Sequence, residues 1–242
     1  MQSIMSLNQS LFYQKEHFLV NDFASCYSNQ PGNDGSVKLI FEYNTNWGVV
    51  DLLIINYNKR VLEARYDELI NYNHIENGTS KLVGHALSFL SHNSSISYAE
   101  LGQFLNLRTN QTLKLVDLLV DRKLIYTYES KTIKLRAKED LFFINSVYAV
   151  EAKLKNWRNA IAQAERHLWF TNHSFILIPE LNTETQFKVR LQCQQKRLGL
   201  IIQQRSDSFK FLEKPTNDCL FVNYFLWKMN ESLLDSMLDD NW

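Results

Sequence analysis

Hydrophobic residues in the first 60 positions follow first a helical and then a strand-like spacing. In residues 7–27 the apolar side chains recur every three or four positions, which predicts an amphipathic helix. After the turn-forming stretch SNQPGNDGS, two apolar runs at 37–43 and 48–56 are separated by the polar link NTNW. These runs predict a β-hairpin. The second run is apolar on both faces, as in a central strand, and only Asp51 interrupts it.

The pattern becomes helical between residues 60 and 140. A connecting helix is expected in KRVLEARYDELI, and three further helical segments follow at 81–93, 97–107 and 109–124. Two alternating runs around a turn, at 125–137, complete the region. Helices followed by a hairpin outline a winged helix-turn-helix, and the phrase SYAELGQFLNL is typical of such modules. We therefore expect an inserted winged helix-turn-helix domain at 60–140.

The α/β pattern returns after residue 142. It predicts strands at 146–154, 174–180 and 198–204, and helices at 156–170, 183–197 and 219–238. The expected fold class is α/β, with a mixed sheet flanked by helices. Residues 1–59 and 141–242 form this discontinuous core, and the winged helix-turn-helix divides it. The strongly apolar closing helix is expected to pack on the core, with a dimer or complex interface as the alternative.

The composition is that of an ordinary globular protein, with 45% hydrophobic residues and 26 basic against 26 acidic side chains. Any nucleic-acid surface must therefore come from local segregation of charge. Three widely spaced cysteines fit a reducing compartment. The first residues lack a basic region followed by an apolar stretch, so no secretion signal is expected, and no apolar run approaches the ~20 residues of a membrane span. We expect a cytoplasmic protein with no membrane partner.

Charge is segregated along the chain despite the neutral total. Residues 104–138 hold eight basic and three acidic side chains, whereas residues 213–242 hold two basic and six acidic ones. We expect a basic module that contacts DNA through the start of its third helix and its wing. The candidate DNA-binding residues are Arg108, Thr109, Asn110, Gln111, Lys114, Lys131 and Lys134. A protein–protein or dimerisation surface is the alternative.

Two acids and a lysine interrupt the apolar strands. Alternate residues of a strand share a face, so Glu151 and Lys153 are neighbours near the end of their strand, where α/β sheets usually place sites. Asp51 lies in the other strongly apolar strand, and a buried carboxylate needs a cationic partner. If the two strands are adjacent, Asp51 and Glu151 can converge on one divalent cation beside Lys153. A structural Glu–Lys pair is the alternative interpretation.

The order of elements, with an aspartate in a hairpin strand and Glu-x-Lys on the next core strand, resembles the PD-(D/E)xK nuclease superfamily. The resemblance covers most of residues 7–204 outside the insertion. It implies a restriction-endonuclease-like core in which Asp51 and Glu151 bind Mg²⁺, or alternatively Mn²⁺. Lys153 would contact the attacking water or the scissile phosphate. Gln163 matches a glutamine that some members carry on the following helix, Glu16 loosely matches an acid on the first helix, and Val50 departs from the usual proline.

The hypothesis that follows is a Mg²⁺-dependent DNA endonuclease, with Asp51, Glu151, Lys153 and Gln163 as catalytic residues. The resemblance further implies a setting in foreign-DNA defence or mobile-element processing. The alternative is a non-catalytic DNA-binding regulator or complex subunit that keeps the nuclease fold as a scaffold. An interaction protein that binds no nucleic acid is a third interpretation. Assembly as a homodimer or within a larger complex stays open.

Overall fold

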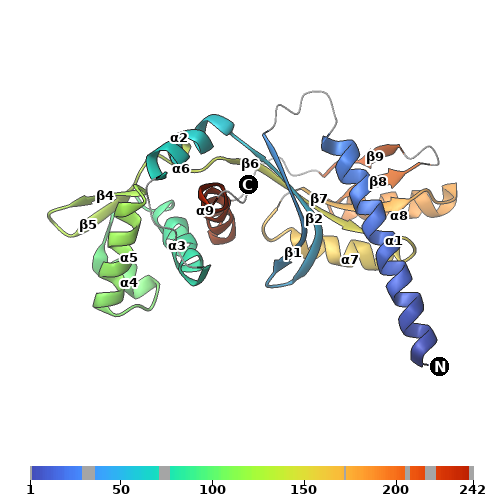
Figure 1. Ribbon diagram of the computed structural model, residues 1–242, viewed down its shortest axis with the longest axis horizontal. Helices are drawn as coiled ribbons and strands as arrows, with labels where there is room; N and C mark the ends of the chain where they lie inside the picture. Colours follow the sequence, from blue (N-terminus) through green and yellow to red (C-terminus); the bar gives the residue numbers. More distant parts are fainter. Residues whose placement is uncertain are drawn as a thin grey trace. The chain divides into compact units, whose positions relative to one another are not determined.

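The chain folds into two compact units, shown together in Figure 1. Unit 1 comprises residues 1–56 and 145–221, and unit 2 comprises residues 57–144 and 222–242. The structure, a computed structural model, describes residues 2–28, 36–70, 77–171, 173–204, 208–215 and 222–239. Each unit is described by itself below.

Unit 1 is built on a six-stranded mixed sheet with the strand order β1-β2-β6-β7-β8-β9. The strands are β1 (Val37–Thr45), β2 (Gly48–Tyr57), β6 (Ile144–Ala152), β7 (His173–Pro179), β8 (Gly199–Gln203) and β9 (Phe209–Glu213). β1 and β2 form the expected antiparallel hairpin, and β6, β7 and β8 are parallel. Hydrogen bonds from Ala152 to Asp51 and from Asn56 to Ser146 show that β2 runs antiparallel to β6. The prediction of a mixed α/β sheet is confirmed, although β9 was not expected.

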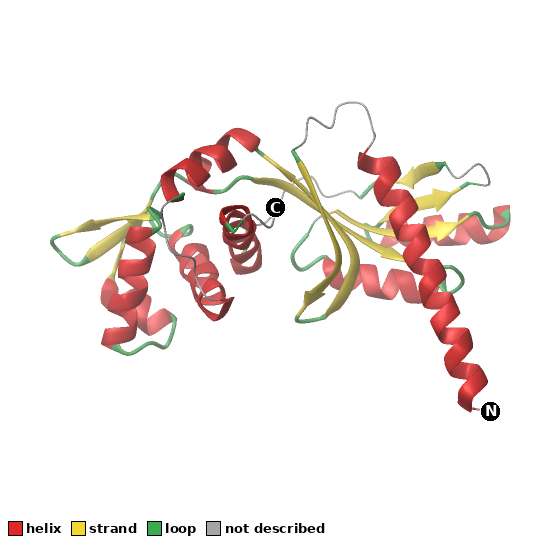
Figure 2. Cartoon of the chain, in the orientation of Figure 1, coloured by secondary structure: helices red, strands yellow, loops and turns green. Residues whose placement is uncertain are grey.

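Helices cover both faces of this sheet (Figure 2). They are α1 (Gln2–Ser28), α7 (Trp157–His167) and α8 (Thr183–Gln195). On one face, Phe23 of α1 packs in a buried cluster with Leu52 and Val150. On the other face, Ile161 of α7 packs with Ile176 of β7. Burial on both sides explains why β2, β7 and β8 are apolar at consecutive positions.

Unit 2 contains six helices and a small antiparallel sheet within its described residues. The helices are α2 (Lys59–Leu69), α3 (Asn77–Leu90), α4 (Tyr98–Phe104), α5 (Thr109–Asp121), α6 (Lys138–Leu141) and α9 (Tyr224–Leu238). The strands β3 (Ile96–Ser97), β4 (Ile125–Tyr128) and β5 (Thr132–Leu135) pair in the order β3-β5-β4. A capping box between Ser97 and Glu100 starts α4. α3, α4, α5 and the β4–β5 hairpin confirm the predicted order of elements.

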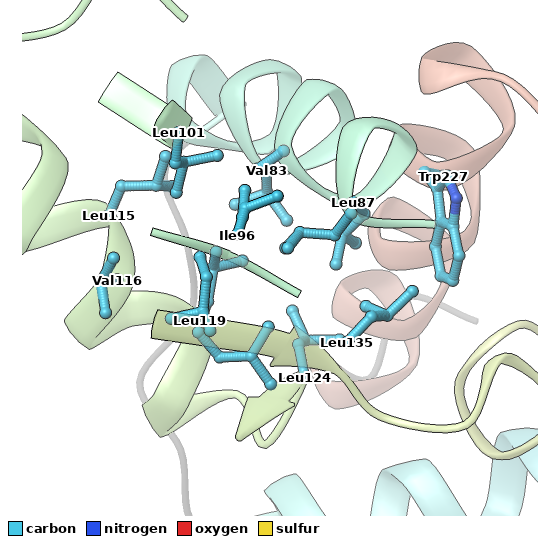
Figure 3. Close-up of a cluster of buried hydrophobic side chains, with 14 of the residues drawn as sticks. Val83, Leu87, Ile96, Leu101, Leu115, Val116, Leu119, Leu124, Leu135 and Trp227 are labelled. Carbon is cyan, nitrogen blue, oxygen red and sulfur yellow. The ribbon is translucent and has the colours of Figure 1, made fainter. Parts of the chain in front are cut away.

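The closing helix α9 belongs to unit 2, so its predicted place in the α/β core was wrong. Trp227 of α9 is fully buried in the unit 2 core with Leu87, Leu119 and Leu135 (Figure 3). Gly84 of α3 allows the two helices to approach closely, because a Cβ there would lie 2.6 Å from the carbonyl oxygen of Tyr224. The apolar pattern of α9 indicated that it is buried, but not which core it completes.

A buried ionic network also fixes α9 within unit 2. The carboxylate of Glu231 lies 2.7 Å from Arg122 and 3.4 Å from Arg65, and all three side chains are at most 1% exposed. Burial raises the pKa of Glu231, but the two guanidinium groups outweigh it and hold that pKa below its usual value. Arg122 also pairs with Asp235 at 2.8 Å. Outside this core, Arg136 pairs with Glu68 at 2.9 Å.

The network corrects the expected charge surface. Arg122 and Arg136 were counted in the basic module, yet their guanidinium groups are paired inside unit 2. The acidic end of the chain supplies two of the pairing carboxylates, from Glu231 and Asp235. The basic module and residues 222–239 of the acidic segment are therefore parts of one folded unit, whereas Glu213 lies in unit 1 and pairs there with Arg190.

Replacing Glu231 by alanine is expected to lower the free energy of unfolding by about 3–5 kcal/mol, because two buried guanidinium groups would lose their shared carboxylate. Urea denaturation followed by circular dichroism measures the change. The matched control is Glu63→Ala, which removes an exposed pair with Lys59 in the same unit and is expected to cost less than about 1 kcal/mol. Equal losses in the two variants would contradict a central role for the network.

Candidate functional site

Asp51 and Glu151 lie on neighbouring strands and on the same face of the sheet. Leu52 and Val150 pack against α1, so the residues one position away, Asp51 and Glu151, belong to the opposite face. The Asp51 carboxylate accepts a hydrogen bond of 2.8 Å from the Ala152 amide. The condition under which the two acids can converge is met, because β2 and β6 are neighbours in the sheet.

Lys153 follows directly after β6, which ends at Ala152 rather than at the predicted residue 154. Its backbone N–H donates to the carbonyl of Leu177 on β7 at 3.0 Å. Its side-chain ammonium donates to the Ala152 carbonyl at 2.8 Å. The hydrogen bond to β7 thus fixes the backbone at the end of β6, and the lysine side chain points toward Asp51 and Glu151.

One ammonium group lies among three carboxylates at this point. The Lys153 nitrogen is 3.1 Å from Glu151, 3.5 Å from Glu16 and 3.7 Å from Asp51. Glu16 comes from α1, and the sequence indicated it only loosely. The structure therefore brings together Asp51, Glu151 and Lys153 as expected and adds Glu16 to them.

The pKa values of these groups reflect burial first and the neighbouring charges second. Burial and the neighbouring Asp51 raise the pKa of Glu151 to about 8, although Lys153 opposes the change. Burial also raises the pKa of Asp51, again against the attraction of Lys153. For Lys153, burial lowers the pKa, but the carboxylates around it prevail and the net shift is upward. Below about pH 8 Glu151 therefore keeps its proton, and a divalent cation would bind its carboxylate by displacing that proton.

Two buried side-chain oxygen atoms of unit 1 have no hydrogen-bond partner within the described residues. They are Oε2 of Glu151 and Oε1 of Gln163, which lies on α7, the helix that covers the face. Carboxylate and amide oxygens are the ligands that Mg²⁺ prefers. Within the described ranges, no three His, Cys, Asp or Glu side chains are grouped so as to hold a metal. Asp51 and Glu151 therefore fit a metal site only if amide, backbone or water oxygens complete it.

His167, one helical turn beyond Gln163, shows a different environment. It is buried beside Phe170, with a ring separation of 6.0 Å, and burial lowers its pKa to about 4. The imidazole is therefore neutral at neutral pH, and its Nδ1 has no hydrogen-bond partner in the part of the chain that the structure describes. Trp157, at the start of the same helix, covers the sheet as a core residue, while Arg158 lies 4.3 Å over its ring.

A small cavity of about 30 Å³ adjoins the acidic cluster. Glu16, Asp51 and Lys153 line it together with His17, Val20 and Glu42. Its volume suits about one water molecule. Glu42 of β1 lies opposite Asp51 and has a positive φ of 49°, a strained conformation for this residue type. The alternating pattern of the strand gives no signal for this backbone conformation.

The seven candidate DNA-binding residues lie in unit 2 and are all exposed: Arg108, Thr109, Asn110, Gln111, Lys114, Lys131 and Lys134. Arg108 caps α5, and the Gln111 side chain accepts a hydrogen bond from the Arg108 amide at 2.9 Å. Thr109 and Lys131 line one cavity of about 440 Å³, between α4, the start of α5 and the β4–β5 turn. The start of the third helix and the turn of the hairpin therefore flank a common hollow.

No family model, curated protein or solved structure matches this chain. Among the described helices, none has the length and apolar character that crossing a membrane requires.

The stability of the protein relative to a Glu151→Gln variant is expected to fall as the pH rises from about 5 to about 8. In this range the folded state retains a proton on Glu151, whose pKa is raised from 4.5 to about 8, while the unfolded state releases it. More protons are then bound in the folded state, so each increase in pH favours unfolding until the folded pKa is passed. Urea denaturation of both proteins across this range measures the difference. Parallel pH profiles would contradict the raised pKa of Glu151.

Proposed function

We propose that the protein is a Mg²⁺-dependent deoxyribonuclease, with Mn²⁺ as an alternative cofactor. The observation that carries the proposal is the convergence of Asp51, Glu151 and Lys153 at the end of β6. The order β1-β2-β6-β7, with an antiparallel hairpin leading into parallel strands, supports a restriction-endonuclease-like core. The helices α3, α4 and α5 with the β4–β5 hairpin support a winged helix-turn-helix in unit 2.

The residues of the site have complementary tasks in phosphodiester hydrolysis. Asp51 and Glu151 would hold the metal, and Asp51 is oriented for this by the Ala152 amide. Bound there, Mg²⁺ would stabilise the negative charge that develops on the phosphoryl group. The Lys153 ammonium supplies a second positive charge that can contact a phosphate oxygen. Gln163 would contribute from α7, where its amide oxygen is buried and has no hydrogen-bond partner within the described residues.

The exposed polar and basic residues of unit 2 support the DNA-binding part of the proposal. Lys131 and Lys134 lie on the β4–β5 hairpin, and Arg108 lies at the start of α5. Phosphate contacts by such side chains fix a protein on a duplex without reading its sequence. Thr109, Asn110 and Gln111, in the first turn of α5, carry side chains that can reach base edges or phosphates.

A non-catalytic DNA-binding protein or complex subunit is the second candidate. It is favoured by the ion pairs between Lys153 and both proposed metal ligands, which show that the cluster can be stabilised without a metal. Cleavage assays with Mg²⁺ and Mn²⁺ on linear, supercoiled and single-stranded DNA separate the two candidates. DNA binding without cutting of any substrate would support the scaffold function.

Substitution of Asp51 by asparagine, Glu151 by glutamine or Lys153 by methionine is expected to reduce cleavage roughly 10²- to 10³-fold, because the first two weaken the hold on the metal and the third removes a positive charge at the reacting phosphate. Initial rates on one DNA substrate in Mg²⁺ measure the effect, and circular dichroism checks the fold. The control is Asp22→Asn, which changes an exposed acid on α1 and should leave the rate unchanged. Undiminished cleavage by all three site variants would overturn the assignment.

Alanine substitutions of Arg108, Lys131 and Lys134 are expected to weaken DNA binding across sequences. Each should also reduce the slope of log affinity against log salt by about 1, because one phosphate contact is lost. Fluorescence anisotropy at a series of salt concentrations measures both quantities. Lys59→Ala, on α2 of the same unit, is the control. Affinities insensitive to all three changes would indicate that DNA binds elsewhere or that the surface contacts protein.

A further inference from the structure

Glu16 contacts two consecutive residues just beyond the end of β6. One of its carboxylate oxygens accepts a hydrogen bond of 3.2 Å from the Leu154 amide, and the other lies 3.5 Å from the Lys153 ammonium. Its side chain is about a quarter exposed, with a fraction of 25%, and that of Lys153 is 16% exposed. α1 thus contributes one carboxylate to a turn that follows it by almost 140 positions.

Glu16 and Asp51 both accept hydrogen bonds from backbone amides at the end of β6. Asp51 accepts from the amide of Ala152, Glu16 accepts from the amide of Leu154, and the amide of Lys153 donates to Leu177 of β7. The carboxylates of Asp51 and Glu16 therefore accept hydrogen bonds from the backbone amides of Ala152 and Leu154, two positions apart at the end of β6. The Lys153 ammonium lies within 4 Å of both of them.

The Lys153 ammonium is attracted by acids on two different elements, the sheet and α1. Glu151 and Asp51 attract the ammonium from the sheet, and Glu16 attracts it from α1. If the charge of Glu16 were removed, Asp51 and Glu151 would be the acids of this cluster that still attract the ammonium. It would then compete more strongly with a divalent cation for the same two carboxylates.

We propose that Glu16 is a positioning residue: it holds the Lys153 ammonium partly on α1 and so leaves Asp51 and Glu151 able to bind a divalent cation. This role rests on the nuclease function proposed above. Glu16 acts through Lys153 and not as a ligand of the metal. Its effect should therefore depend on the presence of the lysine.

Calorimetric titration of the full chain with Mg²⁺ tests this role without requiring cleavage. Glu16→Gln keeps an oxygen for the Leu154 amide and removes only the charge, so the fold should be retained. We expect the dissociation constant for Mg²⁺ to rise roughly three- to tenfold. Asp22→Asn removes an exposed acid from the same helix and should leave the constant unchanged. Thermal unfolding confirms that all variants are folded.

A double-mutant cycle with Lys153→Gln decides how Glu16 acts. If Glu16 acts through the ammonium, Glu16→Gln has no further effect on Mg²⁺ affinity once Lys153 is replaced. An undiminished effect in the Lys153→Gln background would show that Glu16 acts on the metal independently of the lysine, as a ligand or through its charge, and would overturn the positioning role. Equal Mg²⁺ affinity of wild type and Glu16→Gln would overturn it as well. Absence of Mg²⁺ binding in the wild type would instead refute the metal site and, with it, both proposals.

Discussion

The end of β6 depends on the attraction between one ammonium and three carboxylates. Each acid would be costly in this partly buried place without a cation, and the ammonium would be costly without the acids. Their mutual attraction offsets these costs, while Asp51 and Glu16 also satisfy the amides of Ala152 and Leu154. The same contacts therefore orient the backbone and concentrate negative charge at one position of the sheet.

The sequence predicted the part of this site that strand alternation controls. Asp51 and Glu151 interrupt apolar strands, and burial requires such acids to find partners, so their meeting followed from their pattern. Glu16 could not be found in this way, because an acid on an amphipathic helix is ordinary and only the packing of α1 brings it to Leu154. The positive φ of Glu42 and the short strand β9 have no distinctive sequence signal either.

In unit 2 the sequence predicted the elements but not the partners of the charges. The helices and the β4–β5 hairpin follow from local periodicity, which depends on neighbouring residues. The partners of Arg122 do not: Glu231 is 109 positions away and joins it only because α9 packs in the same core. Counting charges along the chain therefore overstated the exposed basic surface. Arg108, Lys131 and Lys134 keep their exposure, so the expected contact surface is smaller but lies in the same place.

The buried position of Glu151 bears on the choice between the proposed metal site and a structural ion pair. Its side chain is 1% exposed, and one of its oxygens has no hydrogen-bond partner, which costs about 1–3 kcal/mol. An apolar side chain at this position would avoid that cost, since buried ion pairs are often no more stable than well-packed apolar groups. This cost would be removed if a divalent cation bound Oε2 of Glu151. The proposed metal site thus accounts for the unsatisfied oxygen of Glu151, for which a structural ion pair gives no reason.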